Sequence, residues 1–208
     1  MKASLIDHMG SDLSVVNAAR VSFGKRSEWV YAGDGYDLSP QDQKLISYLG
    51  KHKHFSPFGH CFASFHIKAP IFVRSQLVKH EYLRMNEVSR RYVDSEPEFY
   101  TPPVWRGRAV DKKQGSSGVV EGIGIDWNPS LQAYNELLDR GVAPEQARMV
   151  LPQSMYTEWY WSGSLDAFAN MCNLRCKPDT QEETRLIADQ VSAIMSELYP
   201  HSWSALTS

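Results

Sequence analysis

The chain has 208 residues, of which 42% are hydrophobic, 12% aromatic and 22% charged. Enough apolar material is present for a folded core, yet no apolar run approaches the roughly 20 residues of a membrane helix, so disordered and transmembrane chains are excluded. The formal net charge of −2 excludes a general basic surface for nucleic acid, so an anionic partner needs a local arginine cluster.

The first part of the chain is expected to alternate helices, turns and one strand. The typical helix start is Ser39-Pro40-Gln41-Asp42, because Ser39 can cap, Pro40 fits the first turn, and a carboxylate is favoured at the helix N-terminus. The spacing of apolar residues and breakers predicts a helix over 12–23, a loop with Gly33 and Gly35, a helix from 40 to about 52, a turn-rich segment at 54–60, a strand over 62–67 and a helix over 70–80.

The second part is expected to be mainly helical, apart from an irregular glycine-rich loop at about 102–126. The pattern predicts a strand at 99–100, a helix over 128–141, a short helix from Pro144 to about Pro152, an aromatic-rich segment at 156–161, a helix over 164–174 and a long helix over 179–199. In the last helix the side chains predicted to face the core are Leu186, Ile187, Val191, Ile194, Met195 and Leu198. These elements predict an α+β fold: one domain over 1–208, with helices packed on a small, mainly antiparallel sheet.

The cysteines and the N-terminus bear on the compartment. Cys61, Cys172 and Cys176 are odd in number, and residues 1–8 lack the shape of a signal peptide. Both features favour a reducing compartment, and we expect a cytoplasmic protein.

The densest group of functional side chains lies between 74 and 92. Arginine and glutamine can bind a phosphate or a base edge, asparagine and serine can orient a ligand, and Glu87 can accept from a ribose hydroxyl. The alternative is a charged helix end followed by an exposed loop. The side chains in question are Arg74, Gln76, Lys79, His80, Glu81, Asn86, Glu87, Ser89, Arg90, Arg91 and Tyr92.

Two more arginines, Arg148 and Arg175, lie among apolar neighbours. A partly buried arginine needs an acceptor, which is either an internal carboxylate or an anionic ligand. Each arginine alone is compatible with a structural ion pair.

Other chemistries are less well supported by the sequence. The histidines His52, His54, His60 and His66 complete no metal-ligand pattern, and neither do Cys172 and Cys176, so we expect no metal. Cys61 with His80 has no local signature of a nucleophile and base. The glycine-rich phosphate loops GxGxxG and GxxxxGK[ST] are absent from the sequence, so a Rossmann unit is not expected.

The segment Lys79-His80-Glu81, with Asn86-Glu87-x-Ser89-x-Arg91-Tyr92 after it, resembles the signature of the flavin-dependent thymidylate synthases, the ThyX family. That family has Arg-His-Arg, seven residues and a serine, where this chain has the divergent Lys-His-Glu. Further segments resemble the family in the expected order, and together they are far more specific than any one of them. They are 18–23, 54–60, 65–73, 147–152 and 170–175.

The resemblance implies reductive methylation of dUMP to dTMP, with FAD as cofactor and with methylenetetrahydrofolate and NADPH as co-substrates. The residues implied for dUMP are Gln76, Lys79, Glu87, Ser89, Arg90, Arg91, Arg148 and Arg175. Arg175 is implied at the uracil ring, where it would stabilise developing negative charge and act as the catalytic residue. The residues implied for FAD are Ser22, Ser56, Lys79, His80, Glu81, Asn86 and Asn170, with His54 and Tyr92 on the folate or flavin-ring side. The resemblance also implies a homotetramer with shared active sites, in which Arg91 serves a neighbour's nucleotide.

Departures from the family pattern lie on the flavin side. Lys79 keeps a charge but loses the guanidinium fork, and Glu81 reverses a charge. Many members have Glu at Gly59, and members often have Asn and Arg at the positions of Ser164 and Asp166. We therefore expect a changed FAD pose or weaker FAD affinity. Residues of the 102–126 loop that can replace the missing contacts are Arg106, Arg108 and Lys112.

Two alternatives to thymidylate synthesis stay open. The altered flavin side is compatible with a flavin-dependent dUMP hydroxymethylase on the same fold, in which a methylene adduct is trapped by water. The other alternative is a non-catalytic homologue that binds a nucleotide.

Overall fold

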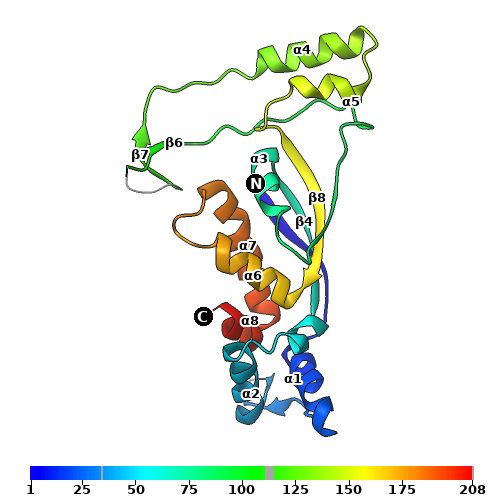
Figure 1. The fold of residues 1–208 in the computed structure, drawn as a ribbon, viewed down its shortest axis with the longest axis vertical. Coiled ribbons are helices and arrows are strands. Elements are labelled where there is room, and N and C mark those ends of the chain that lie inside the picture. Colours follow the sequence, from blue (N-terminus) through cyan, green and yellow to red (C-terminus); the bar gives the residue numbers. More distant parts are fainter. Residues whose placement is uncertain (34, 111–114, 208) are drawn as a thin grey trace.

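The computed structural model describes residues 1–33, 35–110 and 115–207. Its centre is a four-stranded sheet in the order β1-β4-β8-β5, and every neighbouring pair is antiparallel. The strands are β1 Lys2–Met9, β4 Phe62–Pro70, β8 Tyr156–Ser164 and β5 Arg84–Glu87. Helices lie on one face of this sheet and beyond both of its ends (Figure 1), so the predicted α+β class is confirmed.

All of the helices except α8, which was not predicted, occur where the sequence pattern predicts a helix, with shifts at their ends. The helices are α1 Asp12–Arg20, α2 Pro40–Lys51, α3 Ile71–Leu77, α4 Asn128–Asp139, α5 Pro144–Ala147, α6 Leu165–Arg175, α7 Glu182–Leu198 and α8 Pro200–Thr207. There are also three short 3-10 turns in the described residues. The turn η1 Val21–Phe23 continues α1, η2 Ser56–His60 precedes β4, and η3 Arg148–Val150 follows α5. None of the helices in the described residues is long and apolar enough to cross a membrane.

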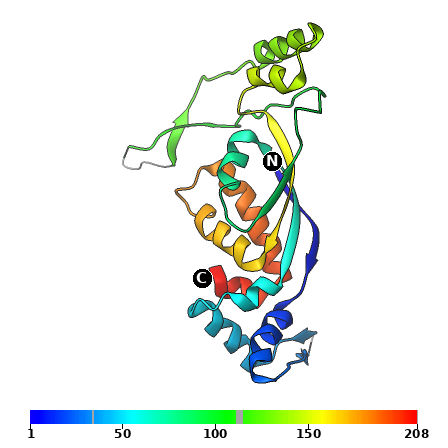
Figure 2. The same ribbon diagram turned by 45° about the vertical axis from the view of Figure 1, so that its right-hand side comes forward.

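The core lies between the sheet and helices α6, α7 and α8, which cover one of its faces (Figure 2). Along β4, alternate side chains are buried, as a strand with one covered face requires. Phe168 of α6 contacts Phe65 and Trp161 edge-on, at ring-centroid distances of 5.1 and 5.4 Å. This packing fixes α6, and with it the position of Arg175 at the end of that helix.

The start of α2 has the predicted cap, and its acidic residue has a further role. The backbone N–H of Asp42 donates to Ser39 Oγ at 3.2 Å. The Asp42 carboxylate is 3% exposed and accepts from Arg20 and Ser27. Burial raises the pKa of Asp42, but the hydrogen bonds from Ser39, Arg20 and Ser27 outweigh it, so this pKa is lowered overall. Asp42 therefore ties α1 to α2.

Several predictions are wrong in detail. The 102–126 segment is not irregular throughout, because β6 Trp105–Arg108 and β7 Ser116–Val120 pair as an antiparallel hairpin. Residues 99–100 form only an isolated bridge from Phe99 to Met155. The loop predicted after α1 contains a small hairpin, β2 Val30–Tyr31 with β3 Tyr36–Asp37.

The long C-terminal helix also differs from its prediction. Helix α7 ends at Leu198, and α8 follows as a separate helix after Tyr199. Leu186, predicted to face the core, is 43% exposed, because the buried stripe of α7 runs through Glu183, Ile187, Val191 and Met195.

Candidate functional site

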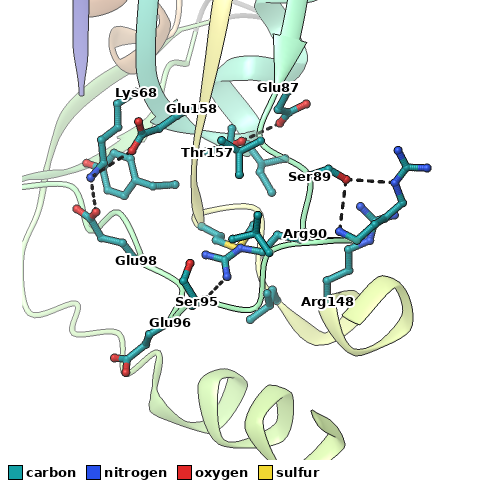
Figure 3. A pocket seen from close by; sticks show the side chains of 17 residues that line it. Lys68, Glu87, Ser89, Arg90, Ser95, Glu96, Glu98, Arg148, Thr157 and Glu158 are labelled. Carbon is teal, nitrogen blue, oxygen red and sulfur yellow. Dashed lines mark hydrogen bonds and ion pairs between the residues drawn. The ribbon is translucent and has the colours of Figure 1, made fainter. Parts of the chain in front are cut away.

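A cavity of about 630 Å³ lies beside β5 and the turn that follows it; we call it the β5 cavity (Figure 3). Its walls come from the end of β5 and the segment after it, from the start of η3, and from the paired ends of β4 and β8. Strand β8 pairs with both β5 and β4, which brings these walls together. Predicted substrate residues that line it are Glu87, Ser89, Arg90, Arg91 and Arg148.

Glu87 is fixed at the end of β5 by two donors. Arg74 Nη2 lies 2.7 Å from Glu87 Oε2, and Thr157 Oγ1 donates to Glu87 Oε1 at 2.9 Å. With the negative charge of Glu87 balanced by Arg74, the carboxylate is held in one orientation and keeps lone pairs for a further hydroxyl.

The turn after β5 presents arginines without a neighbouring acid. Ser89 Oγ accepts from Arg91 Nε at 3.1 Å, and the Arg91 guanidinium lies 4.9 Å from the centre of the Tyr92 ring. Arg90 donates to the Ser95 carbonyl, and Arg148 Nε donates to the Glu145 carbonyl at 3.2 Å. Within the described ranges, no carboxylate lies within 4.0 Å of these three guanidinium groups, so this side of the cavity suits an anion.

The opposite side of the β5 cavity carries acids that the sequence reasoning missed. Lys68 Nζ lies 2.5 Å from Glu98 Oε2 and 3.9 Å from Glu158 Oε1, and Figure 3 shows these three side chains away from Ser89 and Arg148. The hydrogen bond to Glu98 is the main reason why the pKa of Lys68 is raised. The alternation of β4 and β8 places Lys68 and Glu158 on the open sheet face, but strand pairing could not be deduced from the sequence alone.

Arg175 belongs to a second group, at the end of α6. Its Nε donates to His80 Nε2 at 2.9 Å, and its Nη2 donates to the Gln76 carbonyl at 3.1 Å. Burial, and then the charge of Arg175, lower the pKa of His80 to about 4, so His80 is neutral near pH 7 and can accept this bond. Burial lowers the pKa of Arg175 as well.

The charge of Arg175 is left unbalanced by this arrangement. Both of its acceptors are neutral, and none of the carboxylates in the part of the chain that the structure describes lies within 4.0 Å of it. A half-buried cation with neutral partners is suited to a ligand that carries or develops negative charge.

The structure thus divides the predicted substrate residues between two places. The lining of the β5 cavity includes neither Gln76, Lys79 nor Arg175. Gln76 lies on α3 and its Nε2 donates to Gln181 Oε1 at 2.6 Å, while Lys79 is exposed in the turn after α3.

Four of the nine residues predicted for the flavin and its ring side line two further cavities, which lie on either side of the 48–57 segment. The α1–α2 cavity, of about 880 Å³, is lined by Ser22, His54 and Ser56 together with Lys25 and Lys44. The α2–α8 cavity, of about 1060 Å³, is lined by Asn170 together with Lys51 and Lys53. Alternate residues of the segment line opposite cavities, since Lys53 and Phe55 line the second whereas His54 and Ser56 line the first.

The remaining predicted flavin residues are not brought into these two cavities. Glu81, Asn86 and Tyr92 are exposed and absent from both linings, and His80 contacts Arg175. Asp166 Oδ1 accepts from Ser164 Oγ at 2.6 Å at the start of α6. A side chain at Gly59 would meet open space, so the absence of a Glu there leaves room rather than a clash.

Two of the candidates for replacing flavin contacts can be located. Arg106 binds Glu182 and Glu183 on α7, which argues against a flavin role, and Arg108 is exposed on β6. Lys112 lies outside the described residues. Over 1–33, 35–110 and 115–207, no group of three or more His, Cys, Asp or Glu side chains is arranged to hold a metal ion.

The chain is similar to known proteins over almost its whole length. The family model described as "Thymidylate synthase complementing protein" matches residues 4–201. The chain is 39% identical over 207 residues to a "Flavin-dependent thymidylate synthase" of Thermus thermophilus, covering 97% of this chain and 73% of that protein. It is 42% identical over 212 residues to a protein of the same name from Kosmotoga olearia, covering 97% and 87%.

Solved structures of one relative have the same fold. The UMP/dUMP methylase PolB from Streptomyces cacaoi, bound with 5-Br dUMP, matches with a TM-score of 0.84 and 32% identity, over 99% of this chain and 94% of that one. The same methylase bound with 5-Br UMP matches with a TM-score of 0.82 and 31% identity, over 99% and 93%.

Proposed function

Because the chain belongs to the family of flavin-dependent thymidylate synthases, we propose that it methylates dUMP to dTMP in a flavin-dependent reaction. The protein is a methyltransferase of this family. The observation that carries the proposal is a set of arginines without a carboxylate within 4.0 Å among the described residues: Arg91 and Arg148 at the β5 cavity, and Arg175 beside His80. dUMP is a dianion with a polar ring, and it needs such local cations because the chain as a whole is slightly acidic.

At the β5 cavity, we assign the phosphate and sugar to the basic side. Arg91 and Arg148 supply guanidinium groups, Arg90 adds a third, and Ser89 supplies a hydroxyl. Glu87, held by Arg74 and Thr157, is placed to accept from a sugar hydroxyl. Ser89 is a binding residue and no covalent nucleophile is assigned.

Arg175 is the proposed catalytic residue. Two of its N–H groups are committed to His80 and Gln76, and the rest of the guanidinium is free to donate to a uracil carbonyl. A fixed cation at that carbonyl stabilises the negative charge that develops as C5 becomes nucleophilic or C6 takes a hydride. Gln76 and Lys79 complete the nucleotide residues on this side.

The polar and charged side chains that line the α1–α2 and α2–α8 cavities fit FAD. Ser22, His54, Ser56 and Asn170 offer hydrogen bonds, and Lys25, Lys44, Lys51 and Lys53 offer cations for a pyrophosphate. FAD, when bound, would carry the one-carbon unit and deliver the hydride. We propose that these lysines hold its phosphates in place of the arginines that Glu81 and Asp166 replace. Lys79, His80, Glu81, Asn86 and, on the ring side, Tyr92 stay assigned to the flavin only by the family motif.

The finer parts of the proposal rest on the family resemblance. They are methylenetetrahydrofolate as carbon donor and NADPH as reductant. The proposed cytoplasmic location rests instead on the cysteine pattern, and the proposed single domain over 1–208 on the predicted elements. A homotetramer with shared sites is supported by the division of the nucleotide residues, because a second copy could bring Gln76 and Arg175 to the β5 cavity of the first.

The experiment that tests the function is the mass of the nucleotide product. Purified protein is incubated without oxygen with FAD, NADPH, methylenetetrahydrofolate and either dUMP or UMP, since the solved relative PolB is a UMP/dUMP methylase. A methyl increment on dUMP is expected. Unchanged dUMP, with bound flavin confirmed in the same sample, contradicts the proposal.

A hydroxymethyl increment would instead identify the second candidate, a dUMP hydroxymethylase. The observation that favours it is the altered flavin side, where Glu81 is exposed and Asp166 bonds to Ser164. The nucleotide assignments would stand in that case, but the reaction would be different.

A further inference from the structure

We infer that Arg106 is a positioning residue for the nucleotide site: through Glu183 and Gln181 it orients the side-chain amide of Gln76. These four residues, which we call the Arg106 relay, join the β6–β7 hairpin to α7 and α3. The inference rests on the proposed function in one respect, which is that Gln76 contacts dUMP.

The hairpin of β6 and β7 reaches away from α4 and α5 toward the turn between α6 and α7 (Figures 1 and 2). Gly115, just before β7, lies against that turn, because a side chain there would come within 3.3 Å of the Asp179 carbonyl oxygen. Gly115 also has a φ of +86°, which favours glycine. The turn that it contacts directly follows Arg175, so the hairpin lies next to the nucleotide site.

Arg106 forms the polar connection between this hairpin and α7. Its Nη2 lies 2.6 Å from Glu183 Oε1 and its Nη1 lies 3.1 Å from Glu182 Oε2, while its Nε donates to Ser116 Oγ at 2.9 Å. The guanidinium therefore spans both strands of the hairpin and the first turn of the helix. The pair with Glu183 is the stronger constraint, because the Glu183 side chain is 5% exposed whereas that of Glu182 is 44% exposed.

Glu183 depends on Arg106 for its charge. Burial alone would raise the pKa of Glu183, but the hydrogen bond and charge of Arg106 lower it overall, and the Gln181 side chain lowers it further. The other groups that face this carboxylate are Tyr100, whose hydroxyl donates at 3.4 Å, and Glu182 beside it. Its second oxygen, Oε2, is buried with no hydrogen-bond partner among the described residues, so loss of Arg106 would leave a buried charge with little compensation.

The relay ends at Gln76. Gln181 is the N-cap residue of α7, two residues before Glu183, so the first turn of the helix that Arg106 holds also positions Gln181. Its Oε1 accepts from Gln76 Nε2 at 2.6 Å. This bond fixes which end of the Gln76 amide is committed, and leaves Gln76 Oε1 for a ligand. The carbonyl of the same residue accepts from Arg175, so a shift of Gln76 would reach the proposed catalytic guanidinium as well.

A purely structural ion pair predicts a different set of consequences. Such a pair would change the thermal midpoint, and any effect of Arg106 on dUMP binding would be the same with and without the Gln181 side chain. A relay predicts that the binding effect of Arg106 disappears once Gln181 can no longer pass it on.

The test is a double-mutant cycle on the full-length protein with Arg106→Met, Gln181→Met and the double variant. The dissociation constant of dUMP is measured by calorimetry, and the thermal midpoint is recorded for each variant. Arg106→Lys is added to ask whether charge without the guanidinium fork restores binding, and Arg140→Met, an exposed arginine at the end of α4, is the matched control.

Arg106→Met is expected to weaken dUMP binding about tenfold, the size of one lost charge-assisted hydrogen bond. Arg106→Lys should recover part of this loss, and the double variant should be no weaker than Gln181→Met. Equal losses from Arg106→Met in both backgrounds, or a lower midpoint with unchanged binding, would overturn the inference. Wild-type protein that binds no dUMP would refute the proposed function instead, which keeps the two failures apart.

The pH dependence gives an independent readout. In Arg106→Met the pKa of Glu183 should rise, so dUMP affinity should fall on acidification over a range in which wild-type affinity is constant. The Arg106→Met/Glu183→Gln variant should lose that dependence. A dependence that persists without the Glu183 carboxylate contradicts the relay.

Discussion

The proposed nucleotide side and the proposed flavin side of this protein carry their positive charge in different ways. On the proposed nucleotide side most of the cations are arginines. Arg91, Arg148 and Arg175 are held by Ser89, Glu145 and His80, and no carboxylate lies within 4.0 Å of them among the described residues. On the flavin side they are lysines of the 25–53 region, which line two open cavities. A guanidinium fork fixes an anion in one orientation, whereas an ammonium acts as a mobile point charge. We therefore expect the nucleotide to be held in a fixed orientation and the flavin to be bound less firmly.

The largest expected effect comes from Arg175. Arg175→Met should lower kcat by about a hundredfold to a thousandfold, as loss of one donor to a developing negative charge does. Rates of dTMP formation at saturating dUMP measure it, with Arg140→Met as the control. A kcat like that of wild type would remove Arg175 from the catalytic role.

The next largest effect is expected from Arg148, and it distinguishes nucleotide binding from flavin binding. Arg148→Met should weaken dUMP binding about ten- to a hundredfold, since a charge-assisted hydrogen bond is lost, and should leave FAD affinity unchanged. Calorimetry gives the dissociation constant of dUMP, and flavin fluorescence gives that of FAD. A parallel loss of FAD affinity would mean that the sides are not distinct.

A smaller effect is expected from the lysines. Lys51→Met/Lys53→Met should weaken FAD binding about tenfold, because two screened charges near a pyrophosphate are worth little more than 1 kcal/mol. Riboflavin, which has no phosphate, should bind both proteins equally, and Lys2→Met on β1 is the control. Asp166→Arg should act in the opposite direction and tighten FAD binding. Unchanged FAD affinity in the Lys51/Lys53 variant would assign the phosphates to other residues.

The smallest effect is a pH dependence of stability. The pKa of His80 is lowered to about 4 from its ordinary value of 6.5, so unfolded chains take up a proton that the folded protein refuses between those values. The stabilisation is therefore complete above pH 6.5 and is lost as the pH falls toward 4. The thermal midpoint should drop on acidification from about pH 7 to about pH 5, and His80→Gln should reduce that drop. An equal drop in His80→Gln would contradict the neutral state of His80.

Local patterns explain which parts of the fold were predictable. Helix α2 was predictable because its cap, Ser39, and its first-turn proline lie next to each other in the chain. Strand β8 was read only as an aromatic-rich segment, since its central place depends on pairing with β4, which comes long before it in the sequence. The β6–β7 hairpin was missed because its glycines hide the period of a strand.

In the site, too, local patterns were predictable whereas contacts made by the tertiary fold were not. Glu87, Ser89 and Arg91 follow one another on one strand and its turn, so one motif predicts that they line one cavity. The ion pair of Glu87 with Arg74 and the Arg106 relay could not be predicted, because each joins elements that only the tertiary fold brings together. The family resemblance implies shared sites, but it did not indicate that Gln76 and Arg175 are the residues that lie outside the β5 cavity of their own chain.

The central claim, that one nucleotide site needs residues from two places in the fold, is tested most directly by mixing two inactive variants. Arg148→Met and Arg175→Met are purified with different tags, mixed, and allowed to exchange subunits, and native mass spectrometry confirms that hybrids form. If a second copy brings Arg175 to the β5 cavity of the first, some sites in the hybrids contain both arginines and dTMP formation returns. Hybrids that form but stay inactive would show that each site is built from a single chain, and would contradict the account.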